Sequence, residues 1–254
     1  MTAADLPGVT VITGASEGIG RSLALELARR GEAVALLARR KPLLDEAVAE
    51  IAKAGGRAIA VPCDVTEREA VRAAIAGIEQ SFGPVERVIA NAGGGKRAPG
   101  AALDAAAIEA TMRLNYMGTV HTIEAALPFM LARRRGHLVI MSSLAALLGL
   151  PGAAGYSAAK AAVARLGESL QIDLAPHGID VTLLYPGFVD KGGKKKRRPL
   201  AMSLARMTRR TADAIQARRR CSLYPASLRL LLALVRGLPA GLRVSLLSRF
   251  AKKG

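Results

Sequence analysis

The sequence contains two cysteines, no tryptophan and few aromatic residues of any kind. Cys63 and Cys221 form no Cys-x-x-Cys pair, and neither lies near histidines at the spacing of metal ligands. We therefore expect no disulfide framework and no metal site, and a cytoplasmic location suits such a chain. The first apolar segment begins within ten residues of the start and follows Asp5, so we expect no secretory signal.

Acidic residues are nearly absent from the C-terminal quarter. Residues 1–190 hold 19 Lys/Arg and 19 Asp/Glu, whereas residues 191–254 hold 18 Lys/Arg and one acid, Asp213. The asymmetry predicts a basic surface for an anionic partner, such as a lipid surface, a phosphorylated or acyl-carrier substrate, or nucleic acid; a solvated tail is the alternative. The run KKKRR at 194–198 has no aromatic residues between its charges, and the sequence shows no recognisable nucleic-acid-binding motif. Nucleic acid is therefore disfavoured as the partner.

No apolar run approaches the roughly 18 residues of a membrane span. Residues 227–250 are rich in leucine, but Gly237 and Pro239 should divide them into two short helices. Arginines recur there at nearly heptad spacing, at Arg229, Arg236, Arg243 and Arg249. An apolar face opposite arginines fits peripheral attachment at the inner face of a membrane, and the alternative is a face that covers the core or a subunit interface.

Short apolar runs alternate with longer segments of helical period along most of the chain. The expected strands are 9–12, 33–37, 58–61, 85–90, 137–141 and 179–184, and the expected helices are 18–30, 42–54, 67–82, 105–115, 118–134 and 156–176. Parallel strands need crossover helices, so the pattern predicts an α/β fold: a Rossmann-type doubly wound parallel sheet in three α/β/α layers. We expect one domain, with its core over 1–190 and a basic lid and helical extension over 191–254.

A glycine-rich segment lies between the first expected strand and the first expected helix and reads TGASEGIG over 13–20. Gly14 permits a tight turn, Gly18 lets the backbone approach a pyrophosphate, and Gly20 lets the helix pack close to the strand. The N-terminus of the helix favours an anionic phosphate. In this context the segment predicts dinucleotide binding.

The second expected strand ends in Ala38-Arg39-Arg40, where such a fold meets the adenosine ribose. An acid there would accept a hydrogen bond from the 2′-hydroxyl. Arg39 offers instead a planar guanidinium suited to a 2′-phosphate, which favours NADP(H) over NAD(H).

Tyr156 and Lys160 are four residues apart, on the same face of an expected helix. An ammonium near a phenol stabilises the phenolate, so we expect Lys160 to lower the pKa of Tyr156 and to let it exchange a proton with a substrate oxygen. Taken alone, such a pair is more often part of a solvated helix face.

Further motifs occur in order between these two: Asn91-Ala92-Gly93 after the fourth strand, Asn115 on the following helix, and Ser143 thirteen residues before Tyr156. With the glycine-rich segment and the Tyr/Lys pair, they make the sequence resemble the short-chain dehydrogenases/reductases over residues 8–190.

The resemblance implies a catalytic set of Asn115, Ser143, Tyr156 and Lys160. Tyr156 would be the general acid or base, Lys160 would also hold the nicotinamide ribose, Ser143 would bond the substrate oxygen, and Asn115 would anchor a water. Asp64 would contact the adenine ring. The spacing of thirteen residues to Tyr156 selects Ser143 over its neighbour Ser142 as the catalytic serine. The residues implied for cofactor binding are Gly14, Ser16, Gly18, Ile19, Gly20, Arg39, Asp64, Val65, Asn91, Ala92, Gly93, Tyr156, Lys160, Pro186, Gly187 and Val189.

Two positions depart from the pattern of the family. Lys191 stands where a threonine usually contacts the nicotinamide carboxamide, and Glu17 stands where NADPH-preferring relatives often carry a basic residue. The first puts positioning of the nicotinamide in doubt, and the second weakens the preference for NADP(H).

The predicted function is NADPH-dependent reduction of a hydrophobic or lipid-like ketone or aldehyde to an alcohol, by a homodimer or homotetramer. Oxidation of an alcohol or hydroxysteroid and reduction of an acyl-carrier-protein thioester are alternatives within the same chemistry. A dinucleotide-binding scaffold or sensor with weak turnover is the alternative from another class, and Lys191 is its main support.

Overall fold

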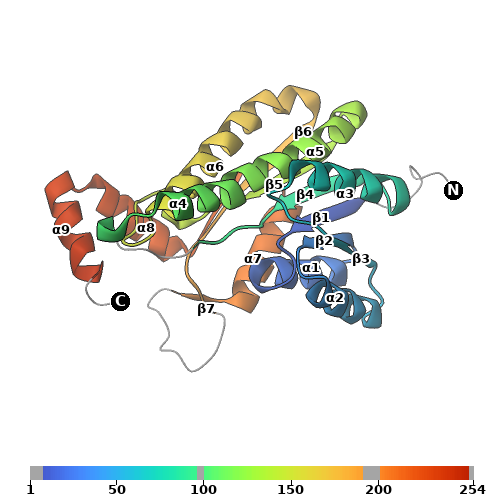
Figure 1. Ribbon diagram of the computed structural model, residues 1–254, viewed down its shortest axis with the longest axis horizontal. Helices are drawn as coiled ribbons and strands as arrows, with labels where there is room; N and C mark the ends of the chain where they lie inside the picture. The colour runs from blue at the N-terminus through green and yellow to red at the C-terminus, as the bar shows by residue number, and fades with distance from the viewer. Residues whose placement is uncertain (1–7, 96–99, 191–200, 252–254) are drawn as a thin grey trace.

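A computed structural model of the chain describes residues 8–95, 100–190 and 201–251. Seven strands form one parallel sheet in the order β3-β2-β1-β4-β5-β6-β9 (Figure 1). They are β1 (Val9–Thr13), β2 (Ala33–Ala38), β3 (Ala58–Pro62), β4 (Val85–Ala90), β5 (Gly136–Met141), β6 (Ile179–Pro186) and β9 (Cys221–Tyr224). The order of strands reverses between β1 and β4, which opens a crevice at the carboxyl edge of the sheet.

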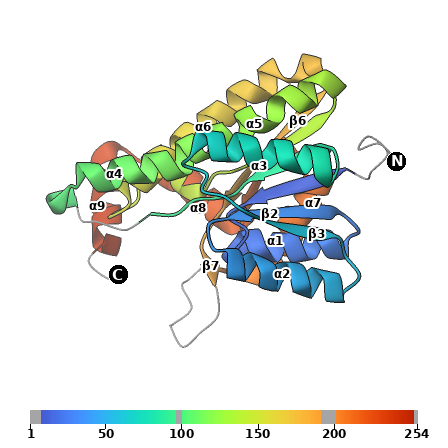
Figure 2. The same cartoon turned by 45° about the vertical axis from the view of Figure 1, so that its right-hand side comes forward.

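Three helices cover each face of the sheet. One layer holds α1 (Gly18–Arg29), α2 (Lys41–Lys53) and α7 (Leu204–Gln216), and the other holds α3 (Arg68–Ser81), α5 (Gly118–Arg133) and α6 (Ala154–Asp173) (Figures 1 and 2). Helix α4 (Ala105–Met112) runs into α5 through a π-helical turn, η3 (Arg113–Met117). The 3₁₀ turns are η2 (Gly100–Ala102), η4 (Leu144–Ala146) and η5 (Ala175–His177), and β7 (Val189–Asp190) pairs with β8 (Met202–Ser203).

The alternation of side chains along the strands explains why both faces are covered. In β2, Ala33, Ala35 and Leu37 belong to the core under α3, α5 and α6, whereas Val34, Leu36 and Ala38 belong to the core under α1, α2 and α7. All six are buried. A strand that is apolar on both faces is stable only between two helical layers, so the predicted three-layer α/β fold is confirmed.

All six strands expected over residues 9–184 and all six helices expected over residues 18–176 are present, with ends shifted by only a few residues. Two core elements were not predicted, α7 and β9. Strand β9 has only four residues and follows three arginines, so its sequence carries little strand signal; it forms because it pairs with β6 from Leu183↔Cys221 to Pro186↔Tyr224. The sheet is therefore completed by residues beyond 190.

The chain ends in two short helices, as predicted, α8 (Ala226–Gly237) and α9 (Ala240–Ala251). The guanidinium of Arg243 donates to the carbonyl oxygen of Arg236 at 3.2 Å, so it satisfies a backbone carbonyl at the C-terminal end of α8. In the part of the chain that is described, no helix is long and apolar enough to cross a membrane. The side chains of Arg229 and Arg249 lie outside the described residues, and peripheral attachment stays a prediction.

Candidate functional site

A cavity of about 790 Å³ opens at the carboxyl edge of the sheet, where β1, β4, β5 and β6 end. The predicted site residues that line it are Gly14, Ser16, Gly18, Ile19, Arg39, Asp64, Val65, Asn91, Ala92, Gly93, Ser143, Tyr156, Lys160, Pro186, Gly187 and Val189. Two predicted residues, Gly20 and Asn115, lie behind this lining. Residues as far apart in sequence as Gly14 and Val189 thus share one cavity, because parallel strands end at the same edge of the sheet.

The glycine-rich turn leaves no room for a side chain at Gly14 or Gly20. Gly14 and Gly18 have φ values of +66° and +59°, in the left-handed region that favours glycine. A Cβ at Gly20 would lie 2.3 Å from the carbonyl oxygen of Gly14 and 2.5 Å from Nδ2 of Asn91. The turn can therefore bring bare backbone, and the N-terminus of α1, against a ligand, which is the arrangement that suits a pyrophosphate.

Asn91 holds this turn in place from the neighbouring strand. Its Nδ2 donates to the carbonyl oxygens of Thr13 at 3.0 Å and Gly14 at 3.3 Å. The hydroxyl oxygen of Thr13 in turn accepts the backbone N–H groups of Asn91 and Ala92, both at 3.1 Å. These bonds join the ends of β1 and β4 across the reversal in strand order.

Four charged side chains form the end of the cavity next to β2. Arg39 lies 3.6 Å from Asp64, and Arg40 lies 3.2 Å from Glu17 and donates to Oγ of Ser16 at 3.0 Å. Burial raises the pKa of Asp64, but hydrogen bonds from Thr66 and the charge of Arg39 outweigh it, so the pKa is below its usual range. Arg40 was not among the predicted site residues, although its place as the second base of Ala38-Arg39-Arg40 could have indicated it.

Lys160 is buried in the middle of the cavity wall, with 3% of its surface exposed. Its ammonium donates to the carbonyl oxygen of Met141 at 2.9 Å and lies 5.8 Å from the centre of the Tyr156 ring. Burial lowers the pKa of Lys160 to about 8. The group therefore changes its charge within a pH range that an enzyme assay covers.

Tyr156 corrects one expectation from the sequence. Burial raises the pKa of Tyr156, and a hydrogen bond with Ser143 lowers it by less. The prediction that Lys160 lowers this pKa is wrong for this arrangement, because the phenol is desolvated and the ammonium donates to Met141. Tyr156 therefore carries its proton at neutral pH.

The two serines after β5 have different partners. Oγ of Ser143 accepts the N–H of Ala145 at 3.1 Å, which caps η4, and also donates weakly to the carbonyl oxygen of Pro186 at 3.5 Å. Ser142 donates instead to the carbonyl oxygen of Lys160 at 2.9 Å. Ser142 thus holds α6 against β5, and Ser143 is the serine that bonds with Tyr156.

Asn115 is fully buried in the π-helical turn, behind Gly93. Its Nδ2 donates to the carbonyl oxygens of Gly94 at 2.6 Å and Thr111 at 2.9 Å, and its Oδ1 accepts the N–H of Gly94 at 3.1 Å. A Cβ at Gly93 would lie 2.6 Å from this Oδ1 and 3.1 Å from Nζ of Lys160. Asn115 therefore fixes the loop beside Lys160, and its water-anchoring role stays a prediction.

The other end of the cavity is apolar. Residues from the β5–α6 loop, from the segment after β6 and from the C-terminal helices line it: Leu144, Ala145, Leu150, Phe188, Leu204, Leu228 and Leu232. Leu228 and Leu232 are one turn apart on α8, so one face of this helix closes the cavity. These two leucines were not predicted as site residues; their spacing of four was the available signal.

Two predicted features, Lys191 and the basic run 194–198, lie outside the residues that the structure describes. Among the residues that are described, no cluster of His, Cys, Asp or Glu is arranged to hold a metal ion. The groups present suit a dinucleotide instead: a bare glycine cradle and a helix N-terminus for phosphates, arginines at the ribose end, and a proton donor at the far end.

Comparison with known proteins gave several matches. The profile of the short chain dehydrogenase family matches residues 8–200. An uncharacterised oxidoreductase of Myxococcus xanthus is 42% identical over 179 residues, which cover 70% of this chain and 71% of the relative. The 3-ketodihydrosphingosine reductase of Mus musculus is 33% identical over 208 residues, which cover 78% of this chain and 63% of that enzyme.

Solved structures match over most of the chain. A short-chain dehydrogenase/reductase from Burkholderia phymatum in complex with NAD has a TM-score of 0.82 and 27% identity, and the match covers 91% of this chain and 93% of that one. An alcohol dehydrogenase from Thermococcus sibiricus complexed with 5-hydroxy-NADP has a TM-score of 0.77 and 27% identity, with coverages of 86% and 96%.

Proposed function

This chain belongs to the short-chain dehydrogenase/reductase family, and from that premise we propose that it uses NADPH to reduce a hydrophobic ketone or aldehyde to an alcohol. The observation that carries the proposal is the convergence of Ser143, Tyr156 and Lys160 on one cavity. A glycine cradle lies at one end of this cavity and apolar side chains lie at the other. A binding module would have no use for a buried, protonated phenol at this point.

The bound cofactor would supply the hydride, and the side chains would manage the proton and the charge. Tyr156 would donate its proton to the carbonyl oxygen as negative charge develops there, and its raised pKa keeps that proton available at neutral pH. The Ser143 hydroxyl would hold the same oxygen, and the Lys160 ammonium would bind the ribose next to the nicotinamide. Proton donation from the resting state favours reduction as the direction to assay first.

Two observations support NADPH as the cofactor. Arg39 follows β2 with its side chain 74% exposed, so its guanidinium is accessible to a 2′-phosphate. No acid follows β2 directly to accept from the 2′-hydroxyl of NADH, although Glu17 and Asp64 lie nearby. Relatives bind one or the other nicotinamide dinucleotide, as the Burkholderia complex with NAD and the Thermococcus complex with an NADP derivative illustrate.

The apolar end of the cavity supports a hydrophobic substrate. Leu228 and Leu232 reach it from α8, and Leu204 reaches it from α7. A relative named 3-ketodihydrosphingosine reductase supports a ketone with a long apolar chain. We propose this substrate class without a particular compound.

The test follows NADPH oxidation with a panel of ketones and aldehydes of increasing chain length, and repeats it with NADH. Tyr156→Phe removes only the phenolic oxygen, and Tyr116→Phe, outside the cavity lining, is the matched control. We expect Tyr156→Phe to lower the rate by about 10²- to 10⁴-fold while NADPH still binds, and Tyr116→Phe to keep full activity.

Wild-type protein that binds NADPH and reduces nothing in the panel would overturn the proposal and favour the scaffold or sensor. Lys191→Thr is then the next variant, since restored turnover would attribute the inactivity to that residue. Assembly as a homodimer or homotetramer in the cytoplasm is part of the proposal and is tested by light scattering and cell fractionation.

A further inference from the structure

The loop that follows β3 supplies two residues, Asp64 and Val65, to the lining of the cavity. It begins beside the end of β2, because the N–H of Cys63 donates to the carbonyl oxygen of Ala38 at 3.0 Å. In the proposed function the phosphates of the dinucleotide contact the glycine-rich turn and its nicotinamide lies beside Tyr156. The adenosine half then lies at the β2 end, so the position of this loop affects how tightly that half is bound.

The two lining residues of the loop are held in different ways. Asp64 is held locally, since its Oδ1 accepts the backbone N–H of Thr66 at 3.0 Å and the hydroxyl of Thr66 at 2.9 Å. Val65 is held by α5. Its side chain packs on the start of this helix, where a Cβ at Gly118 would lie 2.7 Å from Cγ2 of Val65. The bonds of Asp64 thus fix the shape of the loop, whereas the contacts of Val65 fix its place on the helix.

His121, one turn after Gly118, adds a hydrogen bond to this packing. Its Nδ1 lies 3.0 Å from the carbonyl oxygen of Val65. Because a carbonyl oxygen can only accept, Nδ1 carries a proton and donates it. His121 is 8% exposed and Val65 5% exposed, so little water reaches the bond. Loss of the donor would therefore leave a buried carbonyl unsatisfied.

Two ion pairs join the residues after the loop to the same helical region, but both lie at the surface. Glu67 pairs with Arg113 at 3.0 Å, and Arg68 pairs with Glu124. Their side chains are between 40% and 60% exposed. Exposed pairs of this kind contribute little to holding a structure in place. The buried bond of His121 is therefore the polar contact that fixes the loop on α5.

We propose that His121 is a positioning residue for the cofactor: by donating to the Val65 carbonyl, it holds the loop where the adenosine half of the dinucleotide binds. His121 is not among the described residues that line the cavity, so it acts through Val65. The inference deepens the proposed function and rests on its dinucleotide binding. Without the bond, the loop is in the binding position for a smaller fraction of the time, and the apparent affinity falls by that fraction.

Three substitutions separate the hydrogen bond from the bulk of the side chain. His121→Leu keeps an apolar side chain of similar size and removes the donor. In His121→Asn, Nδ2 lies close to the place of the histidine Nδ1 and can still donate to the Val65 carbonyl. Thr122→Val is the matched control, because Thr122 is also buried in α5 but its hydroxyl donates within the helix, to the carbonyl oxygen of Gly118 at 2.6 Å.

The experiment measures dissociation constants of the full chain by calorimetric titration, with no substrate present. The probe for the adenosine half is 2′,5′-ADP or 5′-AMP, whichever the wild type binds more tightly, and the probe for the other half is reduced nicotinamide mononucleotide. We expect His121→Leu to raise the dissociation constant of the adenosine probe about five- to twentyfold. The other probe should change by less than about twofold, and His121→Asn and Thr122→Val should stay within about twofold of wild type for both probes.

Three results would overturn the inference. The first is equal weakening of both probes by His121→Leu, and the second is equal weakening of the adenosine probe by Thr122→Val, since either would show a general disturbance of the fold. The third is binding by His121→Asn that is as weak as that of His121→Leu. If the leucine variant does not fold, His121→Gln replaces it, because its amide nitrogen lies near the place of Nε2, away from Val65.

Hydrogen exchange tests the route through the loop. In protein without ligand, the backbone N–H groups of residues 63–67 should exchange about fivefold faster in His121→Leu than in wild type, and saturating NADPH should remove most of this difference. Exchange at an unchanged rate would overturn the proposed route.

The outcomes also separate this inference from the proposed function. Wild-type protein that binds neither NADPH nor NADH would overturn both. Wild-type protein that binds a dinucleotide with an affinity that His121→Leu leaves unchanged would overturn the positioning role of His121 alone.

Discussion

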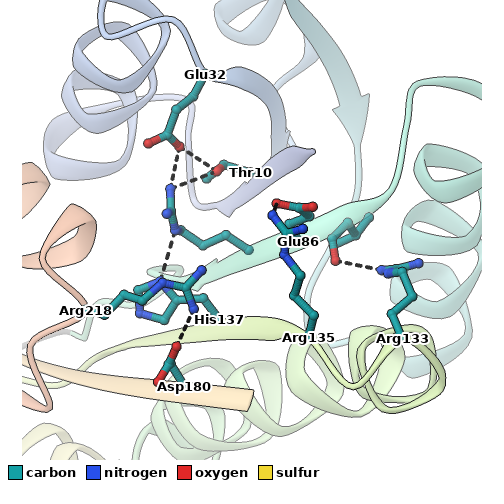
Figure 3. Close-up of polar contacts among 10 residues, drawn as sticks. Thr10, Glu32, Glu86, Arg133, Arg135, His137, Asp180 and Arg218 are labelled. Atoms are coloured by element: carbon teal, nitrogen blue, oxygen red, sulfur yellow. Dashed lines mark hydrogen bonds and ion pairs between the residues drawn. The ribbon is translucent and has the colours of Figure 1, made fainter. Parts of the chain in front are cut away.

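A buried histidine at the amino edge of the sheet should make the stability of this protein depend on pH. His137 on β5 is fully buried, and its Nδ1 accepts from Nε of Arg87 at 3.1 Å (Figure 3). Its Nε2 contacts Oγ1 of Thr182 at 2.8 Å. Arg87 also contacts Glu32 at 2.5 Å. Because a guanidinium can only donate, Nδ1 must be unprotonated and the ring neutral.

The sign and the size of the effect follow from the two states of the ring. Burial, and then the charges of Arg87 and Arg218, lower the pKa of His137 from 6.5 to about 3. Below pH 6.5 the unfolded chain takes up a proton at this ring while the folded chain does not, so the free energy of unfolding falls by about 1.4 kcal/mol per pH unit. Between pH 7.5 and pH 5.0 the loss due to His137 is about 2 kcal/mol.

The assay is urea unfolding of wild type and His137→Gln at pH 7.5, 6.0 and 5.0. We expect the variant to be less stable by about 1–3 kcal/mol at pH 7.5, because glutamine cannot meet both partners of the ring. We expect this deficit to shrink by about 2 kcal/mol by pH 5.0, since the variant has no ring to protonate. His177→Gln, at an exposed histidine, is the control and should leave the pH dependence unchanged. A deficit that is the same at all three pH values would refute the reasoning.

Three further predictions concern the cavity. Gly20→Ala places a Cβ 2.3 Å from a carbonyl oxygen, so in thermal unfolding it should lower the free energy of unfolding by about 1–3 kcal/mol, and it should also weaken NADPH binding. The control Gly77→Ala has open space in α3 and should raise the free energy of unfolding by up to about 1 kcal/mol in the same assay. Leu232→Ala should raise KM for long-chain ketones more than for short ones, and Leu234→Ala, at an exposed position of the same helix, should change neither; equal effects of the two would contradict the lining of the cavity. Because the pKa of Lys160 is about 8, NADPH-dependent reduction should decline as the pH rises through 8, and a rate that is flat to pH 9.5 would show that the ammonium is not required.

The sequence could predict those parts of the site that depend on local motifs. Gly14 and Gly18 adopt the left-handed backbone that their residue type allows, and Tyr156 and Lys160 share a helix face because their spacing is four. Ser143 could be separated from Ser142 only by the motif, and the structure adds the reason, since Ser142 bonds to the backbone of Lys160.

Other parts could not be predicted because they depend on burial and on distant partners. The sequence suggested that Lys160 would lower the pKa of Tyr156, whereas the raised value follows from how deeply the phenol is buried and from the bond of Lys160 to Met141. The pairing of Arg40 with Glu17 joins two loops that follow different strands, and spacing along the chain carries no information on that distance.

The alternation of apolar and helical segments by itself determined the three-layer parallel sheet, since strands that are apolar on both faces are stable only between two layers of helices. Tertiary structure decided where the sheet ends: Cys221–Tyr224 is a strand only because β6 offers it an open edge. It also decided that α8 turns Leu228 and Leu232 into the cavity. Local sequence specifies the period of an element, whereas the surface that buries its apolar face is supplied by the rest of the chain.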